Sequence, residues 1–152
     1  MTHRSLNILS EPFDPEDAHK SFRNAVSGAG AIVAFTGLVR GVGGGKDLSL
    51  TLSHYPDFTE AEIERIAQTA EQRWRLSGWQ IIHRVGRMKA DEPIVFVATA
   101  SQHRRAAFEA ADFLMDYLKS EVPLWKRETV DGQESWIEPR AGDIDDKKRW
   151  SS

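Results

Sequence analysis

The chain has 152 residues, of which 40% are hydrophobic and 28% charged, and its formal net charge is -3. This balance is typical of a globular domain with its own core, and a pI of about 6.0 argues against a nonspecific nucleic-acid binder. The absence of cysteine excludes disulfides, thiolate nucleophiles, persulfide carriers, iron–sulfur clusters and cysteine-bound zinc.

The composition predicts one domain over residues 1–140, followed by a polar tail over residues 141–152 that we expect a partner to order. No apolar run reaches the ~20 residues that span a membrane, and the first residues lack a secretory hydrophobic segment. These features predict a cytoplasmic location.

In the first third of the chain, a helix is predicted over Pro15–Ser27, because Asp14 is a good N-cap and proline suits the first helical turn. Hydrophobic patterning predicts strands over Ala31–Arg40 and Leu48–Tyr55. The glycine-rich segment Gly41–Gly45 lies between them. We therefore expect the two strands to form a hairpin with a mobile tip.

The middle of the chain predicts a helix followed by two strands. The capping-box pattern Thr59–Glu62 opens the helix, and Gly78 is expected to end it. The strands cover Trp79–Met88 and Pro93–Ala100. The second strand is apolar throughout, so we expect it to be buried on both faces.

The last third predicts a long helix from His103 and then two short strands, Lys126–Val130 and Ser135–Glu138. Asp131 and Gly132 suit the tight turn of a hairpin. Helices interspersed with strands that can pair antiparallel predict an α+β layer fold.

The long helix has two apolar stripes, so we expect it to be covered on two sides. One stripe comprises Ala107, Ala111, Leu114, Met115 and Leu118, the other comprises Ala106, Ala110, Phe113 and Tyr117, and Arg105, Glu109, Asp112, Asp116 and Ser120 are left for water.

Basic groups stand at both ends of this helix. Lys119 borders the first stripe, and Pro123 stops the helix so that Lys126 returns on the next element. Two ammonium groups beside an apolar wall predict an anion pocket. His103 and Arg104 at the helix N-terminus oppose the helix dipole unless an anion binds there. Lys119 could instead complement the dipole, and Lys126 could be a solvated strand residue.

Other chemistries find little support in the sequence. The segment Gly43–Lys46 resembles a phosphate loop, but Asp47 replaces the required serine or threonine. The histidines lack metal-ligand spacing, which predicts surface or structural roles for most of them. Ser53 and Ser101 each have a histidine nearby but no nucleophile elbow, and Ser101 is expected to cap the following helix.

Five segments in order resemble the large, catalytic subunit family of molybdopterin synthase: Phe35–Arg40, Leu52–Tyr55, His83–Gly86, Val97–Phe108 and Leu118–Glu128. The likeness spans about residues 13–140. It implies an α/β hammerhead fold with an additional antiparallel β subdomain. It also implies a sulfurtransferase of molybdenum cofactor biosynthesis that converts cyclic pyranopterin monophosphate to the dithiolene molybdopterin.

The resemblance further implies that each sulfur comes from the C-terminal thiocarboxylate of a small ubiquitin-like subunit, which explains how a chain without cysteine handles sulfur. No metal or other cofactor is implied. The family's large subunits form a homodimer flanked by two small subunits, a heterotetramer. The main alternative is a non-catalytic module that binds a phosphorylated ligand or the ubiquitin-like protein.

By position, the resemblance makes Lys119 and Lys126 the catalytic pair. We expect Lys119 to serve in acid–base or transient covalent chemistry and Lys126 as an electrostatic clamp. The substrate-binding residues would be Leu38, Val39, Arg40, His103, Arg104, Arg127, Glu128 and Arg140. The family commonly has Glu in place of Ser53 and Gly in place of Ala90, which affects local turn geometry.

Overall fold

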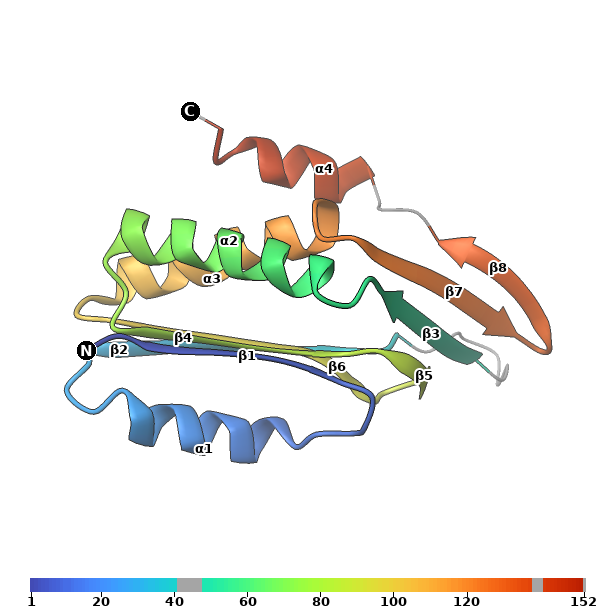
Figure 1. Ribbon diagram of the computed structural model, residues 1–152, viewed down its shortest axis with the longest axis horizontal. Coiled ribbons are helices and arrows are strands. Elements are labelled where there is room, and N and C mark those ends of the chain that lie inside the picture. The colour runs from blue at the N-terminus through green and yellow to red at the C-terminus, as the bar shows by residue number, and fades with distance from the viewer. Residues whose placement is uncertain (41–47, 138–140, 152) are drawn as a thin grey trace.

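A computed structural model describes residues 1–40, 48–137 and 141–151 of the chain. The described part forms two four-stranded sheets and four helices (Figure 1). The central sheet contains β1 (His3–Leu9), β4 (Gly78–Arg84), β6 (Pro93–Ser101) and β2 (Ala31–Leu38), in that order, and the lateral sheet contains β5 (Gly86–Lys89), β3 (Leu48–His54), β7 (Leu124–Val130) and β8 (Gln133–Ile137). The helices are α1 (Pro15–Ala25), α2 (Phe58–Trp74), α3 (Arg104–Ser120) and α4 (Ala141–Lys148).

The central sheet separates two apolar cores. In Figure 1, α1 lies on one face of this sheet, and α2 and α3 lie on the other. Successive side chains of a strand point to opposite faces, so Ile81 packs under α2 and α3 while Ile82 packs toward α1. In β6, the same alternation places Val97 in the core under α2 and α3 and Phe96 in the core toward α1. The predicted burial of this strand on both faces is confirmed.

The predicted pairing of the second and third strands is wrong. β2 pairs antiparallel with β6 in the central sheet, whereas β3 pairs with β5 and β7 in the lateral sheet. Hydrophobic alternation identifies a strand and its inward face but does not specify its partner. The expected tip Gly41–Gly45 lies outside the described residues.

The predicted helix α1, which lies between β1 and β2 in the chain, is confirmed at its start. Asp14 caps α1 by accepting a hydrogen bond from the Glu16 N–H at 2.9 Å. The helix ends at Ala25, two residues earlier than predicted.

The predicted boundaries of α2 are wrong at both ends. The helix starts after Asp57, whose N–H donates to the Glu60 carboxylate at 3.1 Å, and Thr59 is instead buried and donates to the Pro123 carbonyl at 3.0 Å. The helix ends with Arg75 in the left-handed conformation. Gly78 lies in β4, where a Cβ would come within 2.6 Å of the Val26 Cγ1, so close packing explains this glycine.

Two further local expectations are corrected. The predicted strand Trp79–Met88 divides at Val85, which lies between β4 and β5, and the φ of 87° at Gly86 marks the turn from the central sheet to the lateral one. Ser101 ends β6 and does not cap α3, because His103 occupies the N-cap position and makes no side-chain capping bond.

The two-sided covering of α3 is confirmed. Phe113 of the second stripe has its ring centroid 5.1 Å from that of Trp74 and 5.7 Å from that of Trp150. Asp116, expected in water, is 9% exposed and accepts hydrogen bonds from Arg149 at 2.5 Å and from the Trp150 indole at 2.6 Å. A residue distant in sequence thus covers a position that the helical wheel assigns to solvent.

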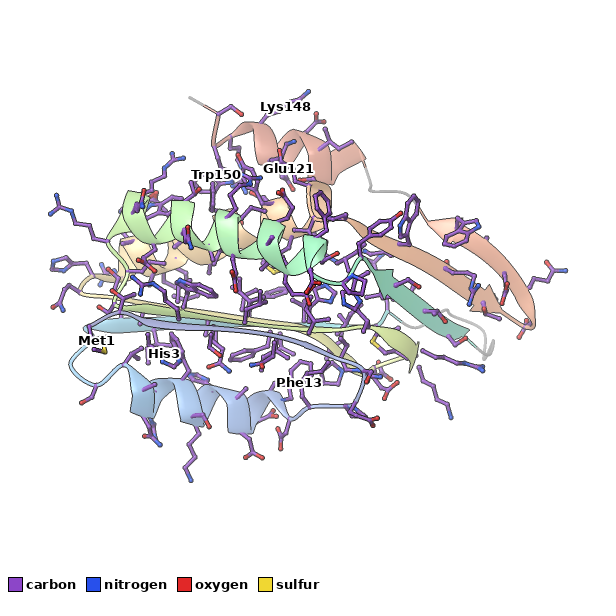
Figure 2. All side chains as sticks on the ribbon, in the orientation of Figure 1. Met1, His3, Phe13, Glu121, Lys148 and Trp150 are labelled. Atoms are coloured by element: carbon purple, nitrogen blue, oxygen red, sulfur yellow. The ribbon has the colours of Figure 1, made fainter. Side chains whose placement is uncertain are left out.

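The C-terminal tail, which was expected to depend on a partner, packs on its own chain. α4 lies over α3 as the outermost layer (Figure 1), and Trp150, which follows α4 in the tail, lies between α4 and the α2–α3 layer (Figure 2). Lys147 donates to Glu121 at 3.0 Å. The tail therefore has a docking surface within one chain.

The lateral sheet is antiparallel throughout. The predicted hairpin at Asp131 and Gly132 is confirmed, with both residues at positive φ, 50° and 84°. The central sheet contains both parallel and antiparallel strand pairs, and the lateral sheet is added to it. This arrangement confirms the α+β fold class and its additional antiparallel β subdomain.

Candidate active site

The two predicted catalytic lysines line one pocket. It lies between the end of α3, the start of β7 and the facing ends of β4 and β6, and its volume is about 60 Å³. Lys119, Lys126 and His83 supply its basic groups. The remaining lining residues are Ile94, Val95, Met115, Leu118, Ser120, Val122 and Leu124.

Local structure brings the lysines together. α3 ends at Ser120, and Pro123 precedes β7, so the chain reverses over three residues, 121–123. Leu124 and Lys126 are two residues apart in a strand and share its inward face. Lys119 in the last helical turn therefore faces the same pocket as Lys126, as the sequence predicts.

His83 is a pocket residue that the sequence pattern did not single out. Its side chain is buried, and its Nδ1 lies 2.9 Å from the Arg84 carbonyl oxygen. Burial, with a smaller contribution from the charges of Lys119 and Lys126, lowers the pKa of His83 to about 4, although the bond to Arg84 opposes the shift. The ring is thus neutral at pH 7. Strand alternation after Ile81 was the available signal, because it places His83 on the inward face.

The end of β2 lies at the same end of the central sheet as the pocket. Val95, which lines the pocket, pairs with Gly37. Val39 is buried, its N–H donates to the Glu92 carbonyl at 2.9 Å, and its own carbonyl accepts from Asp91 at 2.8 Å. Leu38 and Arg40 on either side of Val39 are exposed at this end of the central sheet.

Two predicted substrate-binding residues lie outside the lysine pocket. The Arg127 guanidinium lies 6.0 Å from the centre of the Trp136 ring, and its Nε lies 3.7 Å from the Glu134 carboxylate. Arg127 therefore points away from the face that carries Lys126. Glu128 lines a separate polar hollow on the β7–β8 hairpin.

The predicted phosphate-binding residues at the start of α3 are far from the lysines. α3 is continuous from Arg104 to Ser120, and a rise of about 1.5 Å per residue separates His103 from Lys119 by roughly 24 Å. His103 and Arg104 are exposed at that far end. Arg140 lies outside the described residues.

The described residues contain no group of three or more acidic or histidine side chains that could hold a metal ion. In the same part of the chain, no helix is long and apolar enough to cross a membrane. Two lysines on an apolar wall can bind an anion and stabilise negative charge that develops on it.

The fold and this pocket define an α+β protein in which two lysines line one pocket. The chain belongs to the MoaE family: the family model described as MoaE protein matches residues 8–121. A relative from Cereibacter sphaeroides named molybdopterin synthase catalytic subunit is 46% identical over 143 residues, which are 94% of this chain and 97% of the relative.

Solved structures share the fold. The molybdopterin biosynthesis MoaE protein from Burkholderia ambifaria is 37% identical with a TM-score of 0.84, covering 100% of this chain and 99% of that one. A chain in the complex of subunits 1 and 2 of molybdopterin-converting factor from Helicobacter pylori has a TM-score of 0.76, covering 89% of this chain and 91% of that one. At 18% identity, this second likeness concerns the fold alone.

Proposed function

We propose that this chain is the catalytic subunit of a molybdopterin synthase, a sulfurtransferase that converts cyclic pyranopterin monophosphate to molybdopterin. The observation that carries the proposal is the convergence of Lys119 and Lys126 on one pocket of a MoaE-family fold. A phosphorylated pterin is an anion, and two ammonium groups favour its binding.

The two lysines suit different parts of the reaction. Opening a cyclic phosphate and forming carbon–sulfur bonds requires proton transfer and stabilisation of developing negative charge. Lys119 is exposed at a helix end beside Met115 and Leu118, and it serves as acid–base group or as a transient link to the sulfur carrier's terminal carbonyl. Lys126 is half-buried and serves as the electrostatic clamp.

The sulfur comes from a partner, because the chain has no cysteine. We assign this role to a small ubiquitin-like subunit whose C-terminal thiocarboxylate reaches Lys119 along a narrow channel. Removal of the partner's last two residues is expected to abolish sulfur transfer, measured as dithiolene formation. Unchanged transfer would contradict this route. Fractionation of the native cells should place both subunits in the cytoplasm.

A complete substrate site requires a second copy of the chain. The pocket of about 60 Å³ is smaller than the roughly 300–1,000 Å³ usual for small-molecule sites. In the same chain, we assign Leu38, Val39 and Arg40 to the substrate site because they follow β2 at the same end of the central sheet as the pocket. Arg127 and Glu128 lie on β7 outside the pocket, so they contact only a part of the substrate that extends beyond it. In a two-fold dimer, His103, Arg104 and Arg140 of the second copy complete the site for phosphate and pterin. With two small subunits the assembly is a heterotetramer.

Reconstitution tests the proposal. The purified chain, incubated with thiocarboxylated small subunit and cyclic pyranopterin monophosphate, is expected to form molybdopterin, detected by mass spectrometry. The control replaces the thiocarboxylate with an ordinary carboxylate, which removes the sulfur source. Binding of both partners without product would contradict catalysis and favour a non-catalytic binding module.

A further inference from the structure

A buried histidine forms part of the lysine pocket, and the proposed reaction assigns it no role. His83 is 7% exposed and pairs across the sheet with Val95, another lining residue. A ring at this depth serves either as packing alone or as a polar group presented to the pocket. The hydrogen bonds of its two nitrogens distinguish these roles.

One of the two ring nitrogens already makes a hydrogen bond. A carbonyl oxygen only accepts hydrogen bonds, so the neutral ring donates its Nδ1–H to the Arg84 carbonyl at 2.9 Å. This bond fixes the tautomer and leaves the Nε2 lone pair as an acceptor. Lys119, Lys126 and His54 are the titratable groups whose charges act on the ring. Burial disfavours protonation of the ring, and the charges of the two ammonium groups add a smaller effect in the same direction, so the ring stays neutral.

Acceptors are scarce in this pocket. None of its described lining residues is acidic. Apart from His83, its side-chain acceptors are the Ser120 hydroxyl, which also donates to the Asp116 carbonyl at 2.6 Å, and the weakly accepting Met115 sulfur. A carboxylate in place of His83 would form an ion pair and cancel charge needed for an anionic substrate. A neutral imidazole instead orients an ammonium group and leaves its charge intact.

We propose that His83 is a positioning residue of the sulfur-transfer site, whose Nε2 accepts a hydrogen bond from the Lys119 ammonium when substrate is bound. The proposal rests on the proposed function. It goes further by making the direction of the Lys119 side chain depend on β4, an element remote from Lys119 in the sequence.

Two substitutions separate the two nitrogens of the ring. His83→Asn keeps an amide N–H near the Nδ1 position, which satisfies Arg84, but removes the acceptor at the Nε2 position. His83→Gln places an amide oxygen near the Nε2 position but gives up the bond to Arg84. If His83 positions Lys119, His83→Asn should impair catalysis and spare stability. His83→Gln should impair stability and spare catalysis.

In the reconstituted reaction, His83→Asn is expected to lower kcat at least about tenfold, the effect of losing one charge-assisted hydrogen bond, with KM for the pterin within about twofold. His83→Gln is expected to keep kcat within about threefold of the native value while its midpoint of thermal unfolding falls. His19→Gln on the exposed face of α1 is the control, expected to change neither quantity.

Native kcat in His83→Asn would overturn the positioning role. The positioning role would also be overturned if kcat fell in step with the midpoint of thermal unfolding in both variants, because a residue that only packs affects catalysis only through the stability of the fold. If His83→Gln does not fold, His83→Asn alone tests the positioning role. A lowered kcat with an unchanged midpoint of thermal unfolding would support it. An inactive native chain in the same assay would instead contradict the proposed function.

Discussion

Lys119 and Lys126 occupy one pocket but differ in burial. Lys119 lies in the last turn of a helix, and Lys126 lies on the inward face of a strand. Lys119 is exposed and Lys126 is half-buried. Loss of the Lys119 side chain should therefore cost little packing energy. Its contribution is expected to be chemical.

Lys119→Ala is expected to lower the rate of molybdopterin formation at least about 100-fold, the usual effect of losing a proton-transfer group. Lys119→Arg is also expected to stay slow, because a guanidinium keeps the charge but does not release a proton. Lys20→Ala on α1, equally exposed, is the matched control. Thermal unfolding should be unchanged in all three variants, and a native rate in Lys119→Ala would refute its assigned role.

The depressed pKa of His83 makes stability depend on pH. Its pKa is about 4 in the folded chain and about 6.5 when unfolded, so below pH 6.5 the unfolded state binds a proton that the folded state does not. The stability contribution is complete above pH 6.5 and is lost as pH falls toward 4. At one pKa unit per 1.36 kcal/mol, the loss is on the order of 3 kcal/mol.

Urea unfolding of the native chain and of His83→Gln between pH 7 and pH 4 measures this linkage. The free energy of unfolding is expected to fall more steeply in the native chain, because glutamine does not titrate. Equal slopes in the two proteins would show that His83 is protonated in the folded state over this range.

At the scale of elements, α3 is held from two directions by parts of the chain that lie far apart in sequence. Trp150 packs against the second apolar stripe of α3. Its indole N–H donates to Asp116 at 2.6 Å, and its ring centroid lies 5.5 Å from that of Trp74. The Arg73 guanidinium adds a hydrogen bond to the Trp150 carbonyl at 3.2 Å. The tail thus contributes to the core on the lysine side of the central sheet.

Trp150→Ala is expected to lower the free energy of unfolding by about 2 kcal/mol, since the ring is partly buried and its loss also removes one of the two hydrogen bonds that Asp116 accepts from the tail. Ile144→Ala in the same tail is the control, because Ile144 is 44% exposed. Denaturant titration measures both variants. A tail that is ordered only by the partner would instead leave Trp150→Ala as stable as the control.

At the scale of the whole molecule, the length of α3 separates the predicted site into two halves. One small pterin cannot contact both His103 and Lys119 across roughly 24 Å of the same helix. A two-fold dimer with two shared sites accommodates both ends. The prediction can be tested by mixing inactive chains.

Lys119→Ala and Arg104→Ala are each expected to be inactive alone. Unfolded together and refolded as a mixture, they should regain part of the activity, because a hybrid dimer contains one site with both residues intact. Mass spectrometry of the native assemblies confirms that hybrids are present. Hybrids without activity would show that each site belongs to a single chain.

Local patterns in the sequence predicted several features that the structure confirms. Asp14 and Pro15 located the start of α1, continuous apolarity located the buried β6, and Asp131 with Gly132 located the hairpin. Each depends on residues within one turn or one strand, where backbone sterics and short-range hydrogen bonds dominate. The resemblance to a known family identified the two lysines that share the pocket.

The tertiary structure decided everything that depends on contacts between distant residues. Pairing of β2 with β6 replaced the expected hairpin, Trp150 buried Asp116, and strand β4 brought His83 under the lysines. Side-chain periodicity states which face of an element is apolar, but many partners can cover that face. The choice among them depends on how all layers pack at once, and this packing placed a neutral imidazole beside two ammonium groups.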